Sequence, residues 1–164
     1  MIICVSLRDL RSSTTIALLL IAVMAAGCQT SGNGVQHKAE KSGTGELRTD
    51  LEPLTTRFPV LDAPERARWM SGTLGSDRAP GPSTYWIDAV ITLSQANTDE
   101  LRSVHAPQSA GATPDVVDDL RAELPTGTVL TSEGLDQAFS HDTWSAKAYL
   151  VPDNRTLVLV AIGT

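Results

Sequence analysis

The chain has 164 residues, of which 13 are basic and 19 are acidic, so its formal net charge is −6. The ten arginines and three lysines are scattered along the sequence, which excludes the basic patch that nucleic-acid phosphates require. The same negative sign excludes attraction to anionic lipid headgroups through surface charge alone.

The first element in chain order is an uninterrupted apolar run over residues 16–26. Its 11 residues are too few for a transmembrane helix, which needs about 20, but they suit the apolar region of an export signal. Arg8 and Arg11 precede the run and provide the positive segment that such signals carry, although Asp9 lies between them. We therefore expect residues 1–27 to be a signal peptide.

The residues that follow the run, Ala25-Ala26-Gly27-Cys28, resemble the lipobox of bacterial lipoproteins. The resemblance implies that the Cys28 thiol receives a diacylglyceryl group and that Cys28 becomes the new N-terminus. A lipobox usually has leucine where this chain has Ala25, and the same residues also satisfy the rule for ordinary secretory cleavage, which would release a free protein. Because Cys28 would be the lone cysteine of the exported chain, lipidation is the better explanation for it.

Residues 28–46 are rich in glycine, serine, threonine and charged side chains, and Val35 is their only sizeable apolar residue. Such a composition predicts a flexible tether, because it cannot bury enough apolar surface to order itself. The remaining residues, 47–164, are enough for one ordinary globular domain.

Within the domain, apolar residues at helical spacing predict a short helix that Asp50 caps and Pro59 ends. Strands are expected over 66–74 and 85–93, with a loop dense in glycine and proline between them. In the second strand the odd-numbered residues from Tyr85 should face the core, and Trp86 and Asp88 should lie on the other face.

Three further helices are predicted. Asn97 and Glu100 have the spacing of a capping box, and Thr113 with the proline after it marks the start of a helix that would run to Leu124. Residues 135–139 form the last helix, with Thr131 or Ser132 as its cap.

Residues 146–151 and 156–162 are expected to form a hairpin that turns at 152–154. The second of these strands is apolar on both faces, so it belongs in the middle of a sheet. The pattern predicts an α+β fold: a single two-layer domain with a mostly antiparallel sheet of about four strands and three or four short helices.

Catalytic signatures are sparse. Ser140-His141-Asp142 holds the three residue types of a hydrolytic triad, but triads are assembled in space from separate segments, so a polar helix end is the favoured interpretation. The histidines lie far apart and no cysteine pair exists, so we expect no metal and no cofactor.

One stretch, residues 66–88, holds two of the three tryptophans and three arginines. Arginine and tryptophan often anchor interfaces, so the sequence offers a candidate interaction surface. Its residues are Arg68, Trp69, Arg78, Trp86 and Asp88. The alternative is that both tryptophans belong to the core and that Arg68 pairs with Asp88 across the strands.

The domain also resembles a group of actinobacterial exported lipoproteins of uncharacterised function, through Arg57-Phe58-Pro59, RWMSGTLG (68–75) and GPSTYWID (81–88). The resemblance implies no catalytic residues. The leading hypothesis is a lipoprotein anchored by Cys28 on the extracytoplasmic face of the cell membrane, binding an envelope protein or a cell-wall component. The alternatives are a small secreted hydrolase that uses His105 or His141, and an anchored inhibitor or immunity protein.

Overall fold

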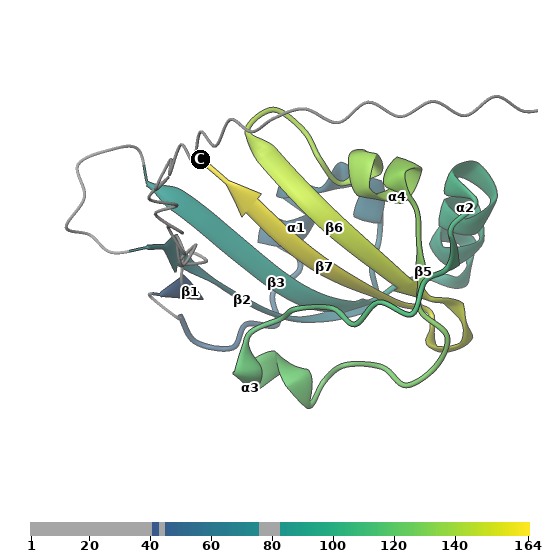
Figure 1. The fold of residues 1–164 in the computed structure, drawn as a ribbon, viewed down its shortest axis with the longest axis horizontal. Coiled ribbons are helices and arrows are strands. Elements are labelled where there is room, and N and C mark those ends of the chain that lie inside the picture. The colour runs from purple at the N-terminus through teal and green to yellow at the C-terminus, as the bar shows by residue number, and fades with distance from the viewer. Residues whose placement is uncertain (1–40, 43–44, 76–82) are drawn as a thin grey trace, which may run out of the picture. The chain divides into compact units, whose positions relative to one another are not determined.

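The computed structural model of the chain describes residues 41–42, 45–75 and 83–164. Their centre is one antiparallel sheet of seven strands in the order β1-β2-β3-β7-β6-β5-β4 (Figure 1). Its long strands are β2 (Arg66–Leu74), β3 (Thr84–Thr92), β6 (Trp144–Val151) and β7 (Thr156–Gly163). The short ones are β1 (Lys41–Ser42), β4 (Gln108–Ser109) and β5 (Leu130–Thr131).

The α+β class with an antiparallel sheet is confirmed, but the prediction of about four strands is wrong. The four long strands are the ones that the sequence predicts, whereas β1, β4 and β5 have two residues each. A strand of two residues is too short to show the alternation by which strands are recognised in a sequence. The sheet therefore extends beyond the predicted strands on both sides.

The hairpin of β6 and β7 is confirmed, with the short helix η2 (Pro152–Asn154) at its turn. As its apolar sequence predicts, β7 lies in the interior of the sheet, between β3 and β6. Leu157 and Leu159 pack into the core on one face of the sheet, and Val158 packs on the other face.

One face of the sheet is covered by helices α1 (Glu52–Arg57), α2 (Gln95–His105) and α4 (Glu133–Ala138), together with the short helix η1 (Pro59–Leu61) (Figure 1). Their buried side chains meet alternate residues of the strands in the main core. This core includes Leu54, Phe58, Leu101, Leu135 and Phe139 from the helices and Trp69, Ile87, Ala89, Ala148 and Leu159 from the sheet. We call this side the helical face.

The opposite face is covered by α3 (Asp118–Arg121) and the loops on either side of it (Figure 1). Val116 and Leu120 pack there against Met70, Trp86 and Val158. The expected helix start at Thr113 is wrong, because residues 113–117 are not helical and α3 begins at Asp118. Burial of Val116 outweighs the local capping signal, as tertiary contacts commonly do.

Two of the predicted helix caps also change. Helix α2 begins at Gln95, and Ser94 is its cap, accepting a hydrogen bond from the Asn97 backbone at 3.1 Å. Asp50 does not cap α1: Leu51 occupies the N-cap position without a side-chain bond, and the Asp50 carboxylate accepts a hydrogen bond from Arg48 at 3.0 Å. Ser132 caps α4 as predicted, 3.0 Å from the Leu135 nitrogen.

Strand β1 lies within the range 28–46 that the composition predicts to be a tether. Lys41 pairs with Leu74 and Ser42 pairs with Thr73, at the outer edge of β2. The Ser42 hydroxyl also donates a hydrogen bond of 2.6 Å to the Gly75 carbonyl. These two residues are therefore part of the sheet, while residues 28–40 lie outside the described residues.

None of the helices in the described ranges is both long and apolar enough to cross a membrane.

Candidate functional site

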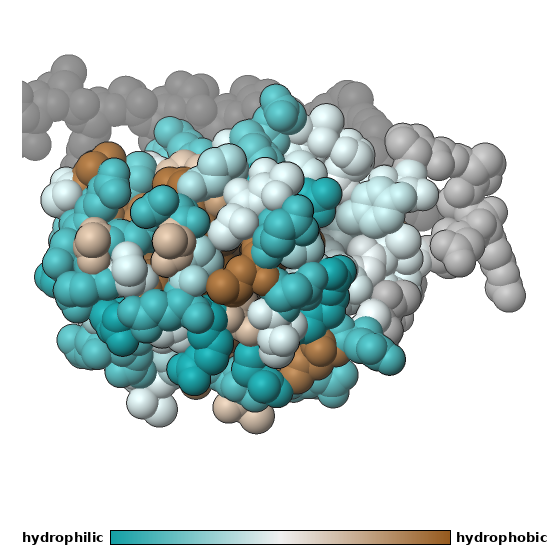
Figure 2. Space-filling model, turned by 180° about the vertical axis from the view of Figure 1, so that it is seen from behind, coloured by the Kyte–Doolittle hydropathy of each residue, from teal (hydrophilic) through white to brown (hydrophobic). Residues whose placement is uncertain are grey.

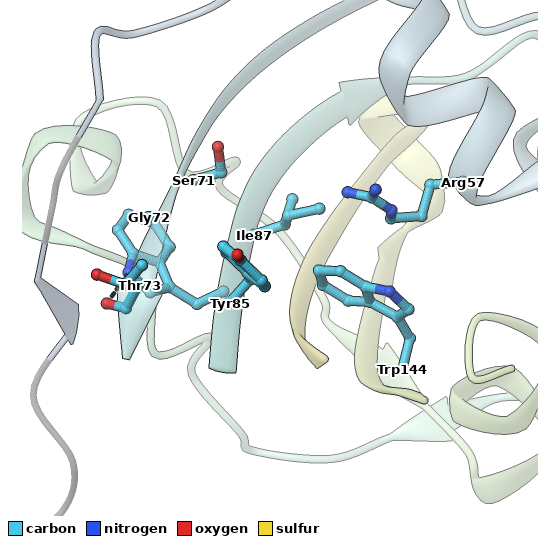
Figure 3. A pocket seen from close by; sticks show the side chains of 8 residues that line it. Arg57, Ser71, Gly72, Thr73, Tyr85, Ile87 and Trp144 are labelled. Atoms are coloured by element: carbon cyan, nitrogen blue, oxygen red, sulfur yellow. Dashed lines mark hydrogen bonds between the residues drawn. The ribbon is translucent and has the colours of Figure 1, made fainter. Parts of the chain in front are cut away.

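A pocket of about 420 Å³ opens on the helical face, at the end of the sheet near the C-terminus of α1 (Figure 3). We call it the Trp144 pocket. Figure 3 shows Arg57 and Trp144 on one side of it and the residues of β2 and β3 on the other. Its lining consists of Arg57, Ser71, Gly72, Thr73, Tyr85, Trp86, Ile87 and Trp144.

The Trp144 ring is fixed by its neighbours. A Cβ atom on Gly163 would lie 2.3 Å and 2.4 Å from the two carbons that the indole rings share, so the glycine backbone supports one face of the ring. The Arg57 guanidinium lies over the ring, 4.6 Å from its centroid, and Phe58 makes an edge contact at 6.2 Å. The ring edge therefore borders the pocket.

Arg57 brings a positive charge to the pocket that no carboxylate in the described part of the chain neutralises. Arg48 provides the contrast, because it also lies over a tryptophan, 4.1 Å from the Trp69 centroid, but it is ion-paired with Asp50. A guanidinium that stacks through its face keeps its N–H donors in the plane of the group. Arg57 can therefore still bind an anion.

The wall opposite Arg57 offers hydroxyl groups. Ser71 and Thr73 lie two residues apart on β2 and therefore on the same face of the sheet. Neither hydroxyl makes a hydrogen bond to another described residue, and the Tyr85 side chain is exposed. Ile87 adds a buried apolar surface between them and Arg57 (Figure 3). The pocket thus combines one cation, hydroxyls that have no partner among the described residues, and hydrocarbon.

A second hollow of about 400 Å³ shares Arg57 and Trp144 with this pocket and contains His141 and Asp142. The His141 ring stacks on Phe58 with centroids 5.7 Å apart, and its Nε2 contacts the Arg57 carbonyl. The Ser140 hydroxyl donates to the Asp136 carbonyl at 2.8 Å. In the described part of the chain the imidazole ring of neither His105 nor His141 bonds to a hydroxyl or a carboxylate, so the triad types do not assemble a catalytic unit.

The two tryptophans of the predicted interaction surface are in the core instead. Trp69 donates to the Asp50 carbonyl at 2.9 Å, and Trp86 donates to the Thr73 carbonyl at 3.0 Å. Buried indoles with satisfied N–H groups are not available to a partner. The expected cross-strand pair is also wrong, because Arg68 lies 2.9 Å from Glu123. Cys28 and Arg78 lie outside the described residues.

Asp88 forms a buried ion pair with Lys41. The Lys41 ammonium donates to both carboxylate oxygens, at 2.7 Å and 2.6 Å, and the Val117 N–H donates to one of them at 2.8 Å. Burial raises the pKa of Asp88 above its ordinary value, and the bond from Lys41 opposes that rise. The fully buried carboxylate thus joins β1, β3 and the α3 loop and is a structural group.

Sequence reasoning missed Arg57, Trp144 and Gly163. Arg57 and Trp144 meet only after the chain has folded, so no local motif could reveal their contact. The available signal was Trp144 itself, because it begins β6 and pairs with Gly163 at the end of β7. Small residues opposite large aromatic ones indicate close packing across strands.

Within the described ranges, no three histidine, cysteine or acidic side chains lie close enough together to hold a metal ion. Comparison of the chain with known protein families, with curated proteins and with solved structures gives no match.

Proposed function

We propose that this chain is a lipid-anchored extracytoplasmic binding protein, held at the cell membrane through Cys28, whose domain takes up an envelope component in the Trp144 pocket. The observation that carries the binding half is a shaped pocket with an Arg57 charge that no carboxylate of the described residues neutralises. A pocket of a few hundred Å³ with a few converging polar groups is the usual form of a small-molecule site. The lipobox-like Cys28 carries the anchoring half.

The surface of the helical face suits a ligand bound in a pocket better than a flat protein–protein interface. Seen from the helical face, the molecule is mostly hydrophilic, and its hydrophobic residues form small separate patches (Figure 2). Extended protein interfaces need a buried apolar or aromatic centre. On this face the Trp144 pocket provides an aromatic recess flanked by the Arg57 charge, which no described carboxylate pairs with.

The anchoring half is tested by fractionation and intact mass of the chain and of Cys28→Ala in a bacterial host. The expected result is a membrane-bound protein that begins at Cys28 and carries a diacylglyceryl mass, which the variant lacks. An unmodified protein in the medium would refute the anchor.

The binding half is tested with Gly163→Ala, because the added methyl group displaces Trp144 from its position. Gly111→Ala is the matched control, since a Cβ atom there meets no other atom within 4 Å. Small molecules that stay with the protein from an envelope extract are identified by mass spectrometry. The same compounds on Gly163→Ala would show that the pocket is not the binding site.

A further inference from the structure

We propose that the Trp144 pocket selects small organic carboxylates with an apolar body and a second polar group, and that Arg57 binds the carboxylate. The proposal rests on the proposed function only in taking this pocket as the ligand site. It names the chemical class of the ligand, which the anchor and the fold leave open.

Charge is the first step of the argument. Arg57 is the only charged residue among the eight that line the pocket, although the chain as a whole has a net charge of −6. A pocket lined by one arginine and by no described carboxylate presents a local site for an anion, even in an acidic protein. The planar guanidinium matches a carboxylate in a two-bond geometry.

The position of Arg57 is restricted before any ligand arrives. Its guanidinium stacks on Trp144, and Trp144 is itself held by Gly163 and Phe58. Because the donors are already oriented, less side-chain entropy is lost when a carboxylate binds. A single fixed cation suits a monoanion better than a polyphosphate, which is usually bound by several cations or a run of backbone N–H groups.

The aromatic residue selects against a bare sugar ring. A sugar stacks on the open face of an indole, but here Gly163 supports one face of Trp144 and Arg57 covers the other. The ring edge and Ile87 remain, and both accept hydrocarbon. The body of the ligand is therefore apolar.

The second polar group follows from the opposite wall. Ser71 and Thr73 line the pocket from β2, on the side opposite Arg57, and their hydroxyls have no partner among the described residues (Figure 3). A ligand whose carboxylate is at Arg57 therefore places its other end near hydroxyl groups that can donate or accept. A hydroxyl or carbonyl at that end satisfies them.

The test uses 3-(4-hydroxyphenyl)propionate as the probe, its neutral amide and the analogue without the ring hydroxyl. Binding to the purified protein is followed by the three indole N–H signals in ¹⁵N-labelled samples. Trp69 serves as the internal reference, since it is buried, hydrogen-bonded and outside the pocket lining. The expected result is a saturable shift of the Trp144 signal, with the amide at least about tenfold weaker and the deoxy analogue weaker than the probe.

Arg57→Gln is expected to weaken the probe at least about tenfold, and it should fold normally because the side chain is exposed. Arg48→Gln is the matched control, as it removes an exposed arginine that also stacks on a tryptophan but lies outside the pocket. Equal affinity of acid and amide, or an unchanged Trp144 signal at about 10 mM probe, would overturn the proposal. Neither result bears on the anchor, which the mass of the Cys28→Ala variant tests separately.

Discussion

The ion pair between Lys41 and Asp88 gives the sharpest prediction for stability. Replacing Lys41 by methionine keeps most of the side-chain volume but leaves a fully buried carboxylate without its cation. Asp88 can then stay charged in the core or take up a proton. Removing one partner of a buried pair typically costs about 3–5 kcal/mol.

The free-energy cost of Lys41→Met cannot exceed the cost of protonating Asp88, because the carboxylate can always become neutral. The ordinary aspartate pKa is 3.8, and keeping the group neutral costs about 1.36 kcal/mol for each pH unit above that value. The limit is therefore about 4.4 kcal/mol at pH 7 and about 1.6 kcal/mol at pH 5. Because the Lys41 side chain is 19% exposed, water relieves part of the penalty, and we expect about 2–4 kcal/mol at pH 7.

Urea unfolding followed by tryptophan fluorescence at both pH values measures this cost. Lys147→Met is the matched control, since Lys147 also lies close to a carboxylate, 2.5 Å from Asp136, but its side chain is 69% exposed. We expect this control to change stability by less than about 1 kcal/mol. The double variant Lys41→Met/Asp88→Asn should recover most of the loss, because an amide oxygen still accepts the Val117 N–H. A Lys41→Met cost below about 0.5 kcal/mol, or one equal at pH 5 and pH 7, would refute the reasoning.

Three further outcomes are expected. Gly163→Ala should destabilise the domain by about 1–3 kcal/mol and change the near-ultraviolet circular dichroism, because the new methyl group meets the Trp144 ring, whereas Gly111→Ala should leave the spectrum unchanged. Ser94→Ala should cost about 1 kcal/mol in thermal unfolding, since the cap of α2 loses its side-chain hydrogen bond. Asp88 binds its proton more tightly in the folded state, so its contribution to stability falls as the pH rises from 3.8 through its raised pKa. Asp88→Asn should remove this part of the pH dependence of the unfolding free energy, measured by urea unfolding across this range. Parallel plots of unfolding free energy against pH for the variant and the parent would contradict the assignment.

The sequence predicts the parts of the fold in which each residue's environment follows from its neighbours in the chain. Strand β2 has the predicted bounds, and the alternation along β3 places Ile87 and Trp86 on opposite faces as expected. The paired apolar faces of β7 correctly indicate an interior strand. These features depend on periodicity, which is a local property of the sequence.

The missed features depend on contacts between distant segments. The helix expected from Thr113 begins later, at Asp118, because Val116 is buried against the sheet and Val117 gives its N–H to Asp88 on β3. The composition around Lys41 predicts a polar tether, because its ion pair with the buried Asp88 forms only when distant segments fold together. The same holds for the candidate site, since Arg57 and Trp144 come from separate elements, α1 and β6.

The two edge strands of the sheet affect how copies of this domain can associate. Strands β1 and β4 lie at the outer positions, and each consists of two polar residues. Long, flat, apolar outer strands template pairing with another chain, whereas short polar ones offer few backbone groups to recruit it. A high concentration of this domain should therefore favour neither strand exchange nor fibril growth through β1 and β4.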